Sequence, residues 1–429
     1  MTAGKPAVSW WRKLLGFGPP KRLQAVASGI HHFRREGGGR VTRFHLRVEE
    51  DGSGLLLANA SVAARLSAAG VVIAHGILKD RAADHIRDDV RRIFRGADDA
   101  RLHSDLEKVT GFIQTLANPE DNYPIFNLDD PSAGPPRKLM APFHAQLPVA
   151  DPDQIKPLLG RLWECGVAHV TFQVVKSSTP EHAVRNVEQA EDLGMISGLS
   201  AIAGWMLARS LMERLAVVGV DYITVPLLFS EEPRQDFLLG PGDFSAAMQV
   251  FSECAAREVC PVAEIPLFKD NVPEIESILE VLRERGVQNV LYYGIASAHQ
   301  PAGLDRAELI QAASIVDELS RAANVRYVWL PAVSRGGSLS DVIEDGPRSA
   351  GDVSIRVEAD GSVFPSRGPK ISAGNLLNDA WPAIWNHEVF KRYRDRVESP
   401  TRCDLCPGLE ICAADCPGEP AGYASEDSK

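Results

Sequence analysis

The sequence has 429 residues, of which 45% are hydrophobic and 24% are charged, and this predicts a globular protein of two or three domains. A formal net charge of −11 argues against general binding to nucleic acid. No apolar run is long enough to cross a bilayer, and the first residues lack the pattern of a signal peptide. We therefore expect a cytoplasmic protein without an integral membrane segment.

Residues 1–42 differ from the rest and form a basic and aromatic extension. Trp10 and Trp11 stand beside basic residues, and three glycines at 37–39 predict a flexible break. One interpretation is an anchor that lies on an anionic surface. The alternative is a tail whose tryptophans pack on the protein itself. We favour the tail, because the segment is short and is interrupted by Pro19-Pro20.

Residues 43–117 predict a small α/β module. The alternation of residue types in 43–49 indicates a strand, Asp51-Gly52 a turn, and 55–59 the returning strand. Helical spacing follows in 80–94 and 102–116. This order resembles the winged-helix, PqqD-like domains of peptide maturation. The resemblance implies that the module captures a leader peptide as an added strand at a sheet edge. A structural cap on the next domain is the alternative.

Residues 118–140 include a proline-rich stretch and predict a linker. Strand and helix patterns then alternate across residues 141–350, which predicts parallel βα units closed into a full or partial barrel. Gly166, Gly219 and Gly286 are each followed by valine, as expected where a helix ends before a buried strand. The expected strands are 143–149, 169–175, 196–202, 222–228, 262–267, 289–293 and 326–330. The expected helices are 154–165, 181–193, 206–217, 244–258, 272–285 and 306–323.

Four of the seven cysteines lie close together near the end of the sequence, at Cys403, Cys406, Cys412 and Cys416. Sulfur ligands at such spacings select zinc, iron–sulfur clusters or copper(I). A pair of disulfides is disfavoured in a cytosolic protein. A structural zinc site fits four thiolates, although two Cys-x-x-Cys pairs are more usual. An iron–sulfur cluster is our preferred interpretation, because of the residues that precede the cysteines.

Those residues carry a hairpin signal at Asp360-Gly361, then Gly374-Asn375 and Ile384-Trp385. Together with the cysteines, residues 351–417 resemble the SPASM domain of radical SAM peptide-modifying enzymes, and residues 418–429 form a tail. The resemblance implies that Cys403, Cys406 and Cys412 hold a [4Fe–4S] cluster, which is completed either by Cys416 or by a non-cysteine group, with zinc as the alternative metal. Ser366 stands where the family has a cysteine, so at most one cluster is expected.

The predicted barrel followed by this tail resembles the radical SAM architecture, an α/β fold with a partial (β/α)6-type barrel. In that family the loop after the first strand carries Cys-x3-Cys-x2-Cys, whose cluster binds S-adenosylmethionine. Here no cysteine precedes Cys165, and Ala150-Asp151-Pro152 leads directly into a helix. Lys176-Ser177-Ser178 stands where the family has a GGEP motif. S-adenosylmethionine is therefore not expected as a cofactor.

His144 and His169 fall at the starts of neighbouring strands and could bind a metal ion, although hydrogen-bonded core histidines are more common. Residues 176–178 could form a new site at the strand ends, or simply an exposed loop, which we favour. Cys165, Cys254 and Cys260 are expected to be small buried hydrophobic residues.

The sequence thus predicts an iron–sulfur-binding, radical SAM-like accessory protein in peptide modification or cofactor assembly. Its expected partners are a peptide substrate, a leader peptide or an active radical SAM enzyme, and not nucleic acid. The alternative is an enzyme of the same superfamily with a repurposed barrel site, or with an electron-transfer role for the C-terminal cluster. Whether the protein is an enzyme stays open at this stage.

Overall fold

A computed structural model describes most of the residues between Val26 and Phe390. The described residues are 26–37, 40–58, 62–94, 99–117, 140–142, 144–330, 332–333, 336–346, 354–365 and 371–390. Trp10 and Trp11, most of the predicted linker, Ser366, the cysteines Cys403–Cys416 and the tail lie outside them. No helix within these ranges combines the length and apolar character that a membrane span requires.

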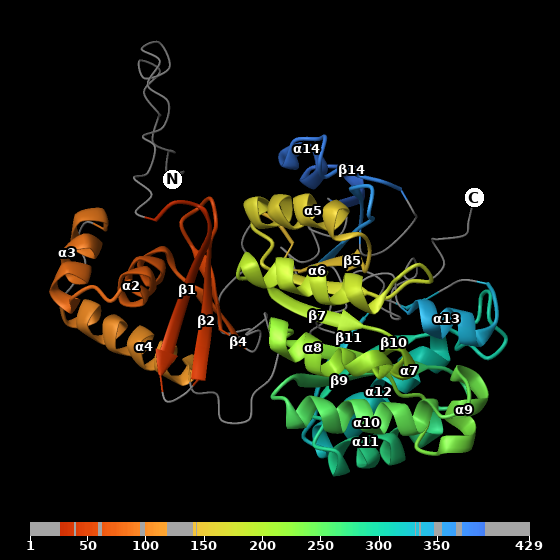
Figure 1. Ribbon diagram of the computed structural model, residues 1–429. Coiled ribbons are helices and arrows are strands. Elements are labelled where there is room, and N and C mark those ends of the chain that lie inside the picture. Colours follow the sequence, from red (N-terminus) through yellow and green to blue (C-terminus); the bar gives the residue numbers. More distant parts are fainter. Residues whose placement is uncertain are drawn as a thin grey trace, which may run out of the picture.

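The N-terminal module is an antiparallel sheet followed by three helices (Figure 1). Its described strands lie in the order β1-β2-β3-β4, and one side of the sheet packs on the helices through an apolar cluster that includes Phe44, Leu46 and Ile86. The strands are β1 (Gly29–Gly37), β2 (Arg40–Val48), β3 (Gly54–Ala58) and β4 (Val62–Leu66), and the helices are α2 (Ala68–Leu78), α3 (Ala83–Ile93) and α4 (Asp99–Ala117).

Three elements of this module were not predicted, namely β1, β4 and α2. Strand β1 lies in the segment that we interpreted as an extension, because its histidines and arginines resemble a basic tail. It pairs with β2 along its whole length, from Gly29 opposite Val48 to Gly37 opposite Arg40. Helix α2 was also missed. It is apolar on most of its surface because it is buried in the module, so it has little of the periodicity that identifies an amphipathic helix.

The second part of the molecule is a mixed α/β structure built on a large sheet. Counted over the described residues, ten strands lie in the order β11-β10-β9-β8-β7-β6-β5-β12-β13-β14, and every ladder from β11 to β12 is parallel. The parallel strands are β5 (His144–Pro148), β6 (His169–Gln173), β7 (Ile196–Ser200), β8 (Tyr222–Pro226), β9 (Cys260–Leu267), β10 (Asn289–Gly294), β11 (Arg326–Trp329) and β12 (Ser354–Val357).

Helices connect the parallel strands, and most of them pack on the sheet through one large apolar cluster, while α9 and α13 belong to a second cluster. They are α5 (Pro152–Cys165), α6 (Pro180–Asp192), α7 (Ala203–Met206), α8 (Leu211–Val218), α9 (Glu232–Leu239), α10 (Asp243–Ala256), α11 (Ile275–Glu284), α12 (Arg306–Ala322) and α13 (Leu339–Asp345), with short 3-10 turns at Ala208–Ser210 and Val272–Glu274. The seven predicted strands are confirmed to within about two residues at each end. Helices α9 and α13 were not predicted, and the helix expected at 206–217 is divided into α7, a 3-10 turn and α8.

The glycines that were expected to end helices do so. Gly166, Gly219 and Gly286 have φ angles of 100°, 93° and 70°, in the left-handed region that glycine adopts without strain. In each case the following valine is buried or leads into a strand. The glycine–valine pairs seen in the sequence therefore mark the ends of helices in the structure.

A hairpin closes the described part of the chain. Strand β13 (Ser362–Pro365) turns back on β12, and β14 (Gly374–Asn375) pairs with β13 before helix α14 (Trp381–Trp385). The turn predicted at Asp360-Gly361 is confirmed, with Gly361 at φ 87°. Because β12 pairs in parallel with β5, the C-terminal region extends the large sheet at the edge next to α5 (Figure 1).

Candidate functional site

Ligands usually bind at the carboxyl ends of the parallel strands in α/β folds, and the connection after β5 lies at this edge of the sheet. The connection is short, and hydrogen bonds fix its backbone. Val149 N donates to Gln173 O at 2.8 Å, and Ala150 N donates to Asn186 Oδ1 at 3.2 Å. Asp151 then caps α5, its carboxylate accepting from Asp153 N at 2.9 Å. The segment is a tight strand-to-helix turn with no thiol.

The loop after β6 is also a structural turn. Ser178 Oγ donates to Val149 O and accepts from Val175 N, both at 2.8 Å, so this hydroxyl fastens the loop to the neighbouring connection. Lys176 and Ser177 are exposed, and Thr179 caps α6 by accepting from His182 N. The arrangement favours the loop interpretation of residues 176–178 over a new site.

The inner face of the large sheet, which is the face opposite the connecting helices, carries a chain of hydrogen bonds. Ser354 Oγ lies 2.7 Å from His144 Nδ1, and His144 Nε2 lies 2.6 Å from Thr171 Oγ1. Thr171 Oγ1 is 2.5 Å from the Tyr222 hydroxyl, which in turn is 2.8 Å from His169 Nε2. All hydrogen bonds of this chain can form whether the protons point toward Ser354 or toward His169, because hydroxyls and neutral imidazoles both donate and accept.

This network decides between the two interpretations of His144 and His169. The residues are register partners on β5 and β6, and their rings lie 4.7 Å apart. Burial lowers the pKa of His144 to about 3 and the pKa of His169 well below its ordinary value, so both are neutral. Both nitrogens of His144 and Nε2 of His169 are occupied by hydroxyl groups. They are hydrogen-bonded core histidines, and the described residues contain no group of three or more His, Cys, Asp or Glu side chains arranged to hold a metal ion.

Further polar side chains lie on the same face nearer the carboxyl ends of the strands. Gln146 Nε2 donates to Gln173 Oε1 at 3.0 Å, and Thr224 and Glu264 are buried on β8 and β9. These residues were not predicted from the sequence. A pattern that indicates them is present, because polar residues recur two positions apart on otherwise apolar strands, as in His144-Ala-Gln146 and Thr171-Phe-Gln173. The group can form hydrogen bonds, and Glu264 is the one carboxylate among these four side chains.

The cysteines outside the C-terminal group are buried, as predicted. Burial raises the pKa of Cys165 to about 11 and that of Cys254 to about 12, and it also raises the pKa of Cys260 well above its ordinary value. Thiols in this state are protonated and behave as small apolar groups. Cys403, Cys406, Cys412 and Cys416, the predicted cluster ligands, lie outside the described residues.

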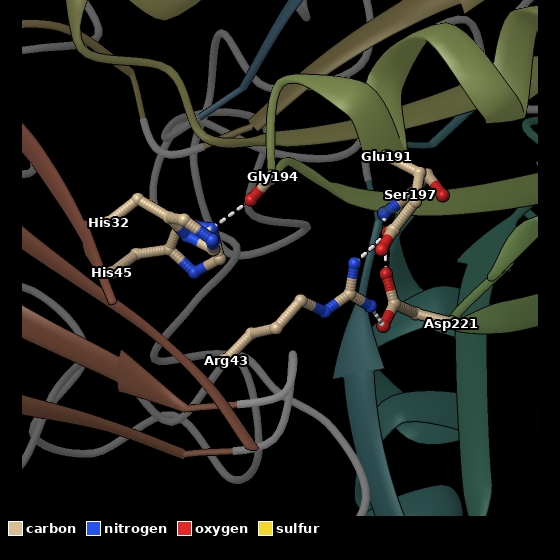
Figure 2. A network of polar contacts seen from close by, with 7 residues as sticks. All are labelled: His32, Arg43, His45, Glu191, Gly194, Ser197 and Asp221. Atoms are coloured by element: carbon tan, nitrogen blue, oxygen red, sulfur yellow. Dashed lines mark hydrogen bonds and ion pairs between the residues drawn. The ribbon is translucent and has the colours of Figure 1, made fainter. Parts of the chain in front are cut away.

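The N-terminal module contacts the amino-terminal ends of the parallel strands, away from the ends just described (Figure 2). Arg43 on β2 forms ion pairs with Glu191 at the end of α6 and with Asp221 just before β8. His45, two residues further along β2, makes a close polar contact with Gly194 O just before β7. Arg43 and His45, which lie on the same face of β2, therefore reach the starts of two neighbouring strands of the large sheet, β8 and β7.

The same face of β2 continues to the start of β5. Arg47 Nη1 donates to Pro142 O at 2.9 Å, and its Nε lies 2.8 Å from Glu49 Oε1. Glu49 Oε2 accepts from Met140 N at 2.9 Å. Strand β2 is thus buried on both sides, with apolar residues against the module's helices and charged residues against the large sheet.

Residues 349–416 match the SPASM family, described as an iron–sulfur cluster-binding domain. The matched segment begins just before β12 and ends at Cys416. It includes the hairpin, α14 and all four C-terminal cysteines, in agreement with the resemblance seen in the sequence.

Two curated proteins from Methanosarcina barkeri are similar in sequence. An AdoMet-dependent heme synthase is 24% identical over 240 residues, which covers 50% of this chain and 67% of the relative. An Fe-coproporphyrin III synthase is 20% identical over 257 residues, which covers 52% of this chain and 64% of the relative. The second relative is thus matched over less than two thirds of its own length.

Solved structures resemble the fold over most of the chain. Streptococcus suis SuiB bound to S-adenosylmethionine superposes with a TM-score of 0.52 and 10% sequence identity, covering 90% of this chain and 95% of SuiB. SuiB bound to its precursor peptide SuiA gives a TM-score of 0.52 at 11% identity with the same coverage. At such identity the likeness shows the fold. The SPASM match and the two sequence relatives are what support the radical SAM/SPASM superfamily.

Proposed function

We propose that this protein is an iron–sulfur-binding, radical SAM-like accessory protein that does not cleave S-adenosylmethionine. The observation that carries the proposal is the connection from β5 to α5. In radical SAM enzymes that connection supplies three thiolates, whereas here Val149, Ala150 and Asp151 form a tight turn without cysteine. The residues present at this connection therefore do not fit the cluster that binds S-adenosylmethionine.

The proposed metal centre is a single [4Fe–4S] cluster on Cys403, Cys406, Cys412 and Cys416, with zinc as the alternative. The SPASM match over residues 349–416 supports an iron–sulfur site in this segment. The buried, protonated state of Cys165, Cys254 and Cys260 supports the view that the C-terminal cysteines are the ligands.

The large sheet then serves as a scaffold of the partial-barrel type, and residues 43–117 as a PqqD-like, winged-helix module that binds a peptide. The likeness to SuiB, which has been solved with a precursor peptide, supports peptide recognition. The likeness to a heme synthase and to an Fe-coproporphyrin III synthase supports the alternative of a role in cofactor assembly. In either pathway, an active radical SAM enzyme would be the partner that performs the chemistry.

The proposal is tested by anaerobic purification and analysis of metal and acid-labile sulfide, followed by an assay of S-adenosylmethionine cleavage with a strong reductant. We expect about four iron and four sulfide per chain and no cleavage above a protein-free control. One zinc without sulfide would replace the cluster with a structural metal. Cleavage that depends on the protein would refute the accessory role and favour the alternative of a superfamily enzyme.

Two variants locate the cluster. The double variant Cys406→Ala, Cys412→Ala should lose the iron, whereas Cys165→Ala, which removes a buried thiol of α5, should retain it.

Binding of candidate precursor peptides, measured by fluorescence anisotropy with the wild-type protein, then separates the peptide pathway from cofactor assembly. A cluster that transfers electrons would show a redox couple on which the turnover of the partner enzyme depends.

A further inference from the structure

The connection from β11 to β12 crosses the carboxyl ends of the parallel strands. In the sheet order, β10, β9, β8, β7, β6 and β5 lie between β11 and β12, so this connection leads from one end of the parallel array to the other. It contains α13, which lies beside α9 on the side of the large sheet opposite the N-terminal module (Figure 1). Helices that connect parallel strands usually cover a face of the sheet, whereas α13 lies over the strand ends.

Apolar contacts hold α13 in this position. Val342 and Ile343 are buried, at 1% and 2% exposure, in a cluster that α13 shares with Leu239 of α9. Most other members of the cluster follow the carboxyl ends of β8 to β11, among them Leu228, Phe229, Phe268, Ile295 and Leu330. The helix therefore closes the end of the large sheet at which its inner face opens.

Hydrogen bonds link α13 to its neighbours, and glycines flank it. Ser340 Oγ donates to Leu238 O of α9 at 2.6 Å, and Gln300 Nε2 donates to Gly337 O at 3.0 Å. Gly337 stands before the helix with a φ angle of 122°, and Gly346 follows it with a φ angle of 61°. Because glycine adopts many backbone conformations without strain, these two positions can serve as hinges.

Polar side chains of four strands lie beneath the end of α13. A Cβ built on Gly346 would be 3.4 Å from Glu264 Oε1 and 3.6 Å from Gln173 Nε2, so the backbone of this glycine lies between β9 and β6. Gln173 Oε1 accepts from Gln146 Nε2 of β5 at 3.0 Å. Thr224 lies on the inner face of β8, the strand that pairs with β9. Gly346 thus covers a continuous polar group.

Two buried oxygen atoms of this group have no hydrogen-bond partner within the described residues. They are Gln146 Oε1 and Thr224 Oγ1, on side chains that are 9% and 2% exposed. A buried polar atom without a partner is destabilising, and a bound group can complete it. Glu264, which is 7% exposed, adds a carboxylate. An amide oxygen, a hydroxyl and a carboxylate are therefore available to accept hydrogen bonds.

The charges around the group suit a cation. Arg356 of β12 is the register partner of Gln146, and it is paired with Glu358. Lys176, in the loop after β6, interacts with the exposed carboxylate of Asp341 on α13. The two histidines of the hydrogen-bond chain on the inner face are neutral. Each of these two basic side chains thus has its own carboxylate, and Glu264 is a further one.

We propose that α13 is a lid over a binding site for a primary ammonium or guanidinium group, and that Gln146, Thr224 and Glu264 form the site. When the lid turns about Gly337 and Gly346, the cationic group takes the place of the Gly346 backbone and donates to the three side chains. An ammonium group has three N–H donors and a guanidinium group has five, and neither accepts. The group belongs either to a free amine or to a basic side chain of a peptide. The site does not rest on the proposed function.

The binding test uses the full-length protein and small probes. Butylguanidine and butylamine carry the proposed group, and butanol is the uncharged control. Glu264→Gln removes the carboxylate and keeps its shape, and Thr224→Val gives a second, independent change. Glu276→Gln, at an exposed position on α11, is the matched control. Saturation-transfer NMR titration measures the affinity of each probe.

We expect both cations to bind and butanol not to bind. Binding should be at least about tenfold weaker in Glu264→Gln, weaker in Thr224→Val and unchanged in Glu276→Gln. A blocked alanine peptide with one central arginine separates the two sources of the group, because tighter binding than butylguanidine assigns a peptide side chain and weaker binding assigns a free amine. Binding of butanol, absence of binding by both cations, or full affinity in both site variants would overturn the site.

The lid is tested by removing one of its hydrogen bonds. Ser340→Ala removes the bond to Leu238 O and should make amide hydrogen exchange in residues 339–346 roughly fivefold faster. The control is Ser314→Ala, which removes a similar bond to Ile310 O, 3.1 Å long, in α12. Because the open lid is the form that binds, Ser340→Ala should also strengthen butylguanidine binding by up to about fivefold, and saturation with butylguanidine should accelerate exchange in α13. Slower exchange with the probe, or unchanged affinity in Ser340→Ala, would overturn the lid.

Discussion

Arg43 and Asp221 form an ion pair that joins the N-terminal module to the large sheet. The Asp221 side chain is 9% exposed, and its second oxygen accepts from Ser197 N at 2.8 Å, so the carboxylate is fixed from both parts of the molecule. Burial raises the pKa of Asp221, while Arg43 opposes this shift. The arginine therefore stabilises a charge that the large sheet has buried at the start of β8.

Replacing Arg43 should cost more than replacing an exposed arginine. Arg43→Met leaves the buried Asp221 carboxylate without its cation, and we expect the free energy of unfolding to fall by about 3 kcal/mol. The control is Arg87→Met, since Arg87 pairs with the exposed Asp84. That substitution should change stability by no more than about 0.5 kcal/mol. Urea denaturation measures both values, and similar losses in the two variants would show that the junction contributes little.

The neutral histidines should make the protein sensitive to acid. A folded-state pKa below the ordinary value of 6.5 means that the unfolded chain binds the proton more tightly. The stability contributed by His45, whose pKa is about 3, is therefore complete above pH 6.5 and is lost as the pH falls toward 3. His144 and His169 act in the same direction, whereas the raised pKa of Asp221 opposes them.

His45→Gln isolates one of these contributions, because the glutamine amide can still donate to Gly194 O but does not titrate in this range. Between pH 6.5 and 4 we expect the slope of stability against pH to decrease by up to about 1.4 kcal/mol per pH unit. His103→Gln, at an exposed position on α4, is the control. Chemical denaturation at several pH values provides the measurement, and parallel curves for wild type and His45→Gln would contradict the assignment.

The sequence was sufficient to predict the parallel strands from β5 to β11, because each is a short and largely apolar run and those after β5 are preceded by a helix that ends at a glycine or a turn. It was also sufficient to predict the C-terminal hairpin, because Asp360-Gly361 between alternating apolar residues is a strong signal for a tight hairpin turn. It was insufficient for the junction. The alternation of Arg43, His45 and Arg47 with Phe44 and Leu46 looks the same whether the polar face meets water or the charged ends of another sheet.

The inner-face network was predicted only in part. His144 and His169 were recognised as neighbours, but their hydroxyl partners come from strands far apart in the sequence, with Ser354 on β12 and Tyr222 on β8. Pairing of β12 with β5 brings Ser354 to His144, and no local pattern indicates that pairing. The cysteines Cys403–Cys416 lie outside the described residues, so their role as ligands stays a prediction.

The C-terminal hairpin should be held to the large sheet by Trp381. Its Nε1 donates to Met140 O at 3.0 Å, and its ring stacks on Trp385 with centroids 5.7 Å apart. Trp381→Phe removes the hydrogen bond and keeps an aromatic ring, so we expect a loss of about 1 kcal/mol. Trp381→Ala also removes the stack and should cost about 3 kcal/mol. Hydrogen exchange of β12 and β13 should accelerate in the same order, and equal effects of the two substitutions would assign the anchoring to the hydrogen bond alone.

Gly198 on β7 should be required for the hydrogen-bond chain of the inner face. A Cβ at this position would overlap the Tyr222 ring, which lies across the glycine to reach Thr171 and His169. Gly198→Ala must displace that ring, and we expect a loss of about 1–3 kcal/mol in the free energy of unfolding.

Gly160→Ala is the matched control for this substitution. Gly160 lies within α5, and a Cβ there would have no heavy atom within 4 Å, so alanine should stabilise the helix by up to about 1 kcal/mol. Opposite signs in the two variants, measured by urea denaturation, would establish that close packing rather than backbone freedom keeps glycine at position 198. If Gly198→Ala matched the wild type, Tyr222 would have an alternative position, and the chain from Ser354 to His169 would not depend on this contact.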